Sequence, residues 1–299
     1  FFAVYFCALI LLMNEDGFRK IKNIITLNYC VLFLNILLSL FGIGFSNYSS
    51  GEGEGFGGTG FLYAGNEVGV ALLVSYGAML TVHKENIRSV LIIIATALIA
   101  GVVVLSKVTL LGVAIVSAVF LYVYNKAIFL GICYALGALV ISQWESVINY
   151  LQLALNRWDF LIELYGWTDF LLGGNKRVSY ILDYLDFVTN NPFYLFIGIG
   201  WVGEAENNLF DLLEGFGLLG LLVFIFWARL LLRPLANSKG TGIGSLNSAV
   251  FYSAAIAGLL TLFITIIAGH TMQSSLITPF IGVLCLTHTK WFKSANHSG

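Results

Sequence analysis

The residue types best suited to chemistry gather in one stretch, residues 173–220, of an otherwise apolar sequence. Its charged residues include two cations near the start and four carboxylates in the second half: Lys176, Arg177, Glu204, Glu206, Asp211 and Glu214. Arginine and lysine bind phosphates and other anions, and arginine is favoured because its planar guanidinium group can donate two parallel hydrogen bonds. A carboxylate partly shielded from water can accept a proton from a hydroxyl group. The stretch therefore contains the parts of an anion-binding and acid–base site.

These residues also have simpler structural explanations. Arg177 falls in the first turn of an expected helix, where a cation opposes the helix dipole, so it either binds an anion or anchors to lipid headgroups. Glu206 could stabilise the start of the next helix through the dipole, and Asn207 could cap it. Asp211 lies five residues after Glu206 and Glu214 lies eight, so Glu214 is closer to the helix face of Glu206.

The elements that position these side chains are expected to be membrane helices. The chain is 59% hydrophobic and only 10% charged, with a mean hydropathy of +0.89, which excludes a soluble domain. Its apolar runs do not alternate as barrel strands do. We expect an all-α, polytopic transmembrane bundle, because backbone polar groups within lipid must be paired internally.

The apolar runs predict nine spans, near residues 1–13, 23–46, 62–82, 89–105, 108–125, 127–149, 207–228, 246–268 and 273–289. The first is too short and starts at Phe1 without Met, so we expect the chain to begin inside a helix. The predicted organisation is six transmembrane helices in 1–149, a large outer loop in 150–206, and three more helices with a cytoplasmic tail in 207–299.

Lysine and arginine set the expected orientation, because loops rich in them stay in the cytoplasm. Placing residues 14–22 inside leaves eleven of the fifteen cations inside. The four cations left on the outer side are Lys107, Arg157, Lys176 and Arg177. One alternating path through the membrane therefore satisfies every loop.

Two outer loops stand out. The glycine-rich "NYSSGEGEGFGGTG", residues 47–60, is typical of a flexible connector and lacks the Gly-Lys-Ser/Thr ending of a phosphate-binding loop. The loop at 150–206 is long enough to indicate function. Helical spacing predicts two amphipathic helices in it, and the buried face of the second would comprise Val178, Ile181, Leu182, Leu185 and Val188.

Several other polar residues have two interpretations. Asn66 and Glu67 lie inside a span near its outer end, where they could contact a substrate or form hydrogen bonds between helices. His270 is the one histidine predicted outside, so it is a second candidate base. The four cysteines have no close pair and no metal-ligand spacing, so they are expected to be small core residues.

Four segments, in this order, resemble the O-antigen polymerase and O-antigen ligase superfamily: "YAGNEVGVALLVSYG", "SKVTLLGVAIVSAVFLYV", "GNKRVSYILDYLDFVTNNPFYLFIGIG" and "ENNLFDLLEGFGLLGLL". The resemblance covers residues 62–289. The family has a Ser-Arg pair at an outer turn, where this chain has Ser106-Lys107. It also has a loop arginine before a Gly-x-Gly turn, which matches Arg177. Ligase members carry His-Asn where this chain has Glu206-Asn207, and this departure favours a polymerase.

The resemblance implies a glycosyltransferase of the GT-C type, without metal or other cofactor, in the bacterial cytoplasmic membrane. It would join glycans carried on polyprenyl diphosphate, as donor and acceptor, on the periplasmic or extracellular side. The product would be O-antigen, capsule or exopolysaccharide. Besides the lipid bilayer, a chain-length regulator is a further candidate partner, and no nucleic acid is expected. The alternatives are ligase-type transfer to a lipid or protein, and a polysaccharide transporter or flippase.

The resemblance also gives the residues roles. Negative charge grows on the departing diphosphate, so fixed cations are needed near the outer surface, and Lys107 and Arg177 are the first candidates. Glu206 is the expected general base. The remaining candidates for substrate binding are Lys176, Arg157, Asn207, Asp211, Glu214, Asn66, Glu67 and His270.

Overall fold

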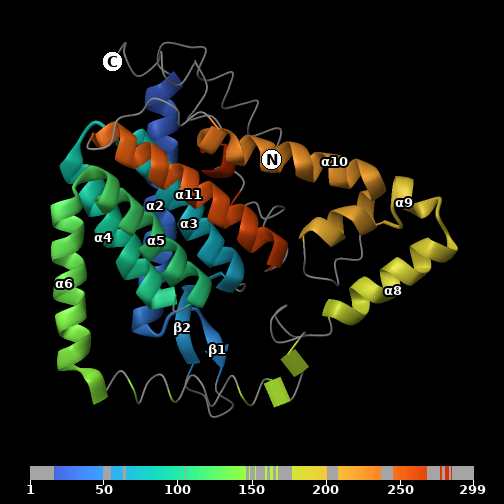
Figure 1. The fold of residues 1–299 in the computed structure, drawn as a ribbon, viewed down its shortest axis with the longest axis horizontal. Helices are drawn as coiled ribbons and strands as arrows, with labels where there is room; N and C mark the ends of the chain where they lie inside the picture. Colours follow the sequence, from blue (N-terminus) through green and yellow to red (C-terminus); the bar gives the residue numbers. More distant parts are fainter. Residues whose placement is uncertain are drawn as a thin grey trace. The chain divides into compact units, whose positions relative to one another are not determined.

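The computed structural model describes residues 17–49, 55–62, 65–104, 106–145, 177–200, 208–236 and 245–267, with short pieces at 148, 152, 159, 162–163, 166–167, 277, 280–282 and 284. These residues are mostly helical (Figure 1), as predicted, although they also include a two-stranded sheet. The chain divides into two compact units. The first comprises Phe1–Tyr124, Ile225–Thr265 and His270–Gly299, and the second comprises Asn125–Phe224 and Ile266–Gly269.

The first unit is built mainly from helices. Its elements are α2 (Gly17–Leu38), the short helix η1 (Ser39–Phe41), β1 (Phe45–Ser49), β2 (Gly55–Gly60), α3 (Gly65–Val82), α4 (Ile87–Val104), α5 (Lys107–Tyr124) and most of α11 (Leu246–Ile267). It also contains the second half of α10 (Asn208–Ala236). Helices α2 to α5 pack side by side (Figure 1). The second unit holds α6 (Lys126–Ser142), α8 (Arg177–Asn190), α9 (Tyr194–Ile197) and the first half of α10.

Four helical segments are long and apolar enough to cross a membrane: Gly17–Phe41, Ile87–Val104, Leu209–Leu232 and Leu246–Ile266. Shorter apolar helices occupy Glu67–Val82, Thr109–Tyr124 and Lys126–Ser142. A helix is thus present at seven of the nine predicted spans, and four of these satisfy the length requirement. Residues 1–13 and most of 273–289 lie outside the described residues. These helices indicate that the chain is a membrane protein.

Hydroxyl groups join the helices of the first unit. The Tyr29 hydroxyl on α2 lies 2.9 Å from the Thr96 hydroxyl on α4. The Tyr76 hydroxyl on α3 lies 2.9 Å from the Ser117 hydroxyl on α5, and both of these side chains are buried. Polar groups within apolar surroundings need such partners, because an unpaired group there costs free energy. These two contacts between hydroxyl groups therefore join α2 to α4 and α3 to α5.

The glycine-rich segment forms an antiparallel hairpin, β1–β2, rather than a flexible connector. Its register has an irregularity between Phe45 and Ser46. Asn35 of α2 fixes the hairpin: its side-chain amide donates to the Thr59 carbonyl at 3.0 Å and accepts from the Phe61 N–H at 2.9 Å. The glycine content did not predict this hairpin, because the hydrogen bonds that hold the strands are made by backbone groups, which glycine also has.

Two predictions about buried side chains are wrong in part. Among the side chains of α8 that the structure describes, Tyr184 and Val188 are buried and Ile181 is half-buried, whereas Leu182 and Leu185 are exposed. The predicted buried face is therefore confirmed at Val188 and wrong at the two leucines. Of the aromatic residues on α8, Tyr184 is buried, whereas Tyr180 and Phe187 are exposed. Cys30 of α2 and Cys133 of α6 are also exposed rather than in the core. Exposed apolar side chains are normal in a chain that meets lipid, so hydrophobicity alone does not identify the protein-facing side of such a helix.

Candidate functional site

The candidate site of the second unit is built around a Gly-x-Gly turn. Helix α9 ends at Gly198, whose φ of 75° is in the left-handed region. A Cβ atom there would lie 2.5 Å from the Gly215 carbonyl of α10, so two backbones meet without a side chain between them. The next residue, Ile199, donates its N–H to the Glu214 carbonyl at 2.7 Å.

Helix α10 kinks at this contact. Gly217 has φ 60° and ψ −146°, and a Cβ atom on it would lie 2.5 Å from the Phe196 carbonyl. Kinks of this kind leave carbonyl groups one turn earlier in need of other donors. The Leu213 carbonyl accepts a hydrogen bond from the Tyr184 hydroxyl at 3.1 Å, just as the Glu214 carbonyl accepts one from Ile199. Helix α8 is thereby held across the kinked part of α10.

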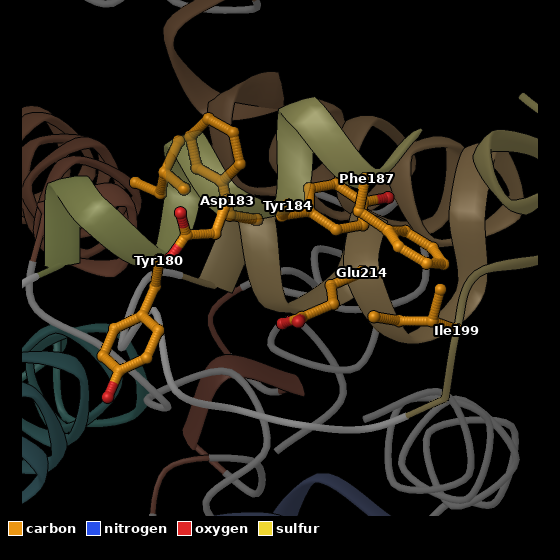
Figure 2. Close-up of a pocket in the computed structure, with 8 residues that line it drawn as sticks. Tyr180, Asp183, Tyr184, Phe187, Ile199 and Glu214 are labelled. Atoms are coloured by element: carbon orange, nitrogen blue, oxygen red, sulfur yellow. The ribbon is translucent and has the colours of Figure 1, made fainter. Parts of the chain in front are cut away.

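The packing of these elements leaves a pocket of about 180 Å³. Figure 2 shows the side chains of α8 on one side of it, with Glu214 and Ile199 on the other. The described residues that line it are Tyr180, Ile181, Asp183, Tyr184, Phe187, Ile199, Phe210 and Glu214. The Phe187 ring packs against the Tyr194 ring of α9, and the ring centroids are 5.4 Å apart. Aromatic rings and two carboxylates therefore surround a space open to small molecules.

The pocket has a negative character. Burial, and then the nearby Glu214 carboxylate, raise the pKa of the Tyr184 phenol above its usual value. The phenol consequently stays protonated and donates its hydrogen bond to the Leu213 carbonyl. Asp183 is exposed and Glu214 half-buried, so both can meet a ligand from solvent. Such carboxylates, when ionised, accept hydrogen bonds from hydroxyl or ammonium groups.

The structure separates the predicted carboxylates of α10. Glu214 lines the pocket, whereas Asp211 is 1% exposed and does not. Arg177 is the first residue of α8, the helix that forms one wall. The remaining candidates of the stretch and of the outer loops, Lys176, Arg157, Glu206, Asn207 and His270, lie outside the described residues.

A separate polar cluster lies at the predicted outer end of the first unit. Ser106 and Thr109, at the start of α5, are buried. Gly69 of α3 faces them, and a Cβ atom there would clash with the Thr109 hydroxyl. Glu67 is half-buried in the first turn of α3, one residue after Asn66, and Lys107 begins α5. The predicted residues Asn66, Glu67 and Lys107 thus belong to helices that pack against each other.

Sequence reasoning missed the α8 wall of the pocket. Tyr180, Asp183, Tyr184 and Phe187 follow the i, i+3, i+4, i+7 pattern of one helix face. A stripe that mixes tyrosines with a carboxylate differs from a lipid-facing stripe, and this composition was the available signal. The predicted buried face of α8 contained only aliphatic residues, so it did not include this stripe.

Comparison of the chain with family models, curated proteins and solved structures finds no match. Within the described residues, no three His, Cys, Asp or Glu side chains are placed to hold a metal ion.

Proposed function

We propose that this chain is a membrane glycosyltransferase that polymerises oligosaccharide repeat units carried on polyprenyl diphosphate. The reaction would take place at the outer face of a bacterial cytoplasmic membrane and yield O-antigen, capsule or exopolysaccharide. The observation that carries the proposal is the pocket between α8 and α10, in which carboxylates and aromatic rings meet. Sugars are bound by this combination, because their hydroxyl groups donate to carboxylates and their C–H faces pack on aromatic rings.

The proposed topology has nine spans with residues 150–206 outside. The pocket then opens on the outer side, because α8 belongs to that loop. Its substrates would arrive from the outer leaflet, where a polyprenyl chain holds the glycan at the membrane surface. The positive-inside distribution of Lys and Arg supports this orientation.

The proposed step joins two lipid-linked glycans. An acceptor hydroxyl attacks the anomeric carbon of the donor, and the bond from that carbon to the diphosphate oxygen breaks. The electron pair leaves with the polyprenyl diphosphate, whose charge Arg177 would stabilise. Lys107 is the other cation predicted for this role from the sequence. The hydroxyl proton passes to a carboxylate. Glu214 is the candidate base within the pocket, and Glu206 is the rival predicted from the sequence.

The test is to supply the purified full chain, in lipid, with defined lipid-linked repeat units. Ladders of increasing length would support polymerisation, and a single transfer to another carrier would replace it with a ligase function. Unchanged glycan would overturn enzymatic function and favour a transporter. The ladders are resolved by gel electrophoresis and mass spectrometry.

Variants assign the roles. Glu214→Gln should slow ladder formation by about 10²–10⁴-fold if Glu214 is the base. Glu206→Gln should do so instead if the rival base operates. Arg177→Ala should abolish ladders in a protein that still folds and inserts, because the diphosphate loses a cation. Asp186→Asn is the matched control, since Asp186 is an exposed carboxylate of α8 that does not line the pocket. Normal chain lengths in Arg177→Ala would remove Arg177 from the mechanism.

A further inference from the structure

The pocket is too small for a whole repeat unit. Its volume is about 180 Å³, whereas pockets for drug-sized ligands measure roughly 300–1,000 Å³. A single sugar ring is the glycan element that matches this space. The ring would contact α8 through Tyr180 and Phe187, and α10 through Phe210 and Glu214.

The charged groups of the pocket have one sign. Asp183 and Glu214 carry its formal charges, and no Lys or Arg is found among the described residues that line it. Burial, and then the Glu214 carboxylate, raise the pKa of the Tyr184 phenol, so Glu214 lies close to that ring. A diphosphate would be repelled by these two carboxylates, because like charges repel each other. This pocket is therefore unsuited to the leaving group.

The residue order of α8 separates two environments along one helix. Arg177 begins the helix, and Tyr180, three residues or about one turn later, begins the wall of the pocket. A cationic end thus precedes an acidic, aromatic segment. A diphosphate would bind near the cations, and a sugar ring would bind near the carboxylates and aromatic rings.

We infer that the pocket between α8 and α10 is an acceptor-sugar subsite that accepts a neutral or amino-bearing ring and rejects an acidic one. Asp183 and Glu214 accept hydrogen bonds from hydroxyl groups and form ion pairs with an ammonium group, but they repel a sugar carboxylate. The aromatic residues hold the apolar face of the ring whatever its charge. This inference rests on the proposed function for the identity of the ligand as an acceptor, while its charge selectivity follows from the pocket.

Saturation-transfer NMR on the purified full chain tests the selectivity with three probes of similar size: glucose, glucosamine and glucuronate. At neutral pH glucuronate is ionised. We expect signal transfer to glucose and glucosamine, and binding of glucuronate weaker by at least about tenfold. The double variant Asp183→Asn, Glu214→Gln should remove most of that difference, because amides keep the size of the side chains and lose their charge.

Asp186→Asn is again the control, because it removes one negative charge from the exposed side of α8 and should leave the selectivity unchanged. Equal binding of glucuronate and glucose by the wild-type chain would overturn the inference, as would unchanged selectivity in the double variant. A circular dichroism spectrum and unfolding temperature like those of the wild type show that the double variant folds. A double variant that does not fold is replaced by the single change Asp183→Asn, which should halve the effect or more.

Binding and turnover separate the two proposals. A chain that discriminates between these sugars but forms no ladders from lipid-linked repeat units keeps the subsite and loses the polymerase function. A chain that forms ladders but binds glucuronate as well as glucose keeps the function and loses the subsite.

Discussion

In the first unit, the buried hydroxyl groups of Tyr29 and Tyr76 each lie within hydrogen-bonding distance of a hydroxyl group on another helix. In the second unit, the carboxylates of Asp183 and Glu214 border a pocket. Both units belong to a very apolar chain, in which each polar side chain needs a partner. The hydroxyl groups of Tyr29 and Tyr76 have their partners inside the protein, so this polarity has a structural use. In the second unit, Asp183 and Glu214 instead line a pocket that a ligand could enter.

The difference teaches how to divide the chain into scaffold and site. Apart from Lys107, a proposed diphosphate-binding residue, changes in the first unit should alter stability and spare glycan transfer. Changes around the pocket should affect transfer directly. Four substitutions test this division, and an effect on the wrong property would break it.

Gly217→Ala should have the largest effect. Alanine is strained at a φ of 60°, and its Cβ atom would meet the Phe196 carbonyl. A non-glycine residue in such a conformation costs about 1–3 kcal/mol, and relief of the strain would change the kink that shapes the pocket. We expect a lower unfolding temperature and loss of ladders. Thermal unfolding in detergent and the ladder assay measure the two effects.

The matched control for that change is Gly131→Ala in α6. A Cβ atom on Gly131 would have no heavy atom within 4 Å, and the residue lies inside a helix, so alanine should be neutral or stabilising there. If Gly217→Ala unfolds and transfers like the wild type, the backbone contact between α9 and α10 does not shape the pocket.

Tyr184→Phe should have the next largest effect. It keeps the ring in the pocket and removes the hydrogen bond to the Leu213 carbonyl, which stabilises by about 0.5–1.5 kcal/mol. Transfer should fall together with stability, because α8 is then held less firmly across α10. Thermal unfolding and ladder rates report both, with Tyr194→Phe of α9 as the control tyrosine. A loss of stability with full transfer would place Tyr184 in the scaffold.

Most of the helical fold could be predicted from the sequence, because long apolar runs leave the backbone few alternatives in lipid. The sequence also predicted that a helix begins near Arg177, and that Glu214 lies closer than Asp211 to the face of α10 that follows Glu206. The hairpin was not, since glycine composition does not show that Asn35 would fix two strands. The pocket needed a contact between Gly198 and α10, which no local pattern encodes.

Tyr76→Phe tests the scaffold side of the comparison. The change removes the hydroxyl that meets Ser117 between α3 and α5. Hydrogen bonds between membrane helices average about 0.6 kcal/mol and reach about 1.7, so the unfolding temperature should fall slightly. Ladder formation should remain at the wild-type rate. A double-mutant cycle with Ser117→Ala isolates the pair, and reduced transfer without loss of stability would extend the site into the first unit.

His83 gives the smallest expected effect and the finest test. It follows α3, its ring nitrogen Nε2 lies 2.9 Å from the Thr26 hydroxyl, and its pKa is lowered, first by burial and then by Lys22. The unfolded chain therefore binds the proton more readily, so stability is full above about pH 6.5 and falls as the pH drops below it. Solvent screens this half-exposed group, and the expected fall in unfolding temperature is within about 2 °C.

The pH dependence can be assigned with His83→Gln, which keeps a polar group near Thr26 and removes the titration. The variant should have a flatter stability profile between neutral and mildly acidic pH than the wild type, in unfolding measured on the same preparation. Sugar binding in the second unit should be the same in both proteins at each pH, because His83 belongs to the first unit. A change in glucose binding that depends on His83 would show that the two units are coupled, and the separation of scaffold from site would then fail.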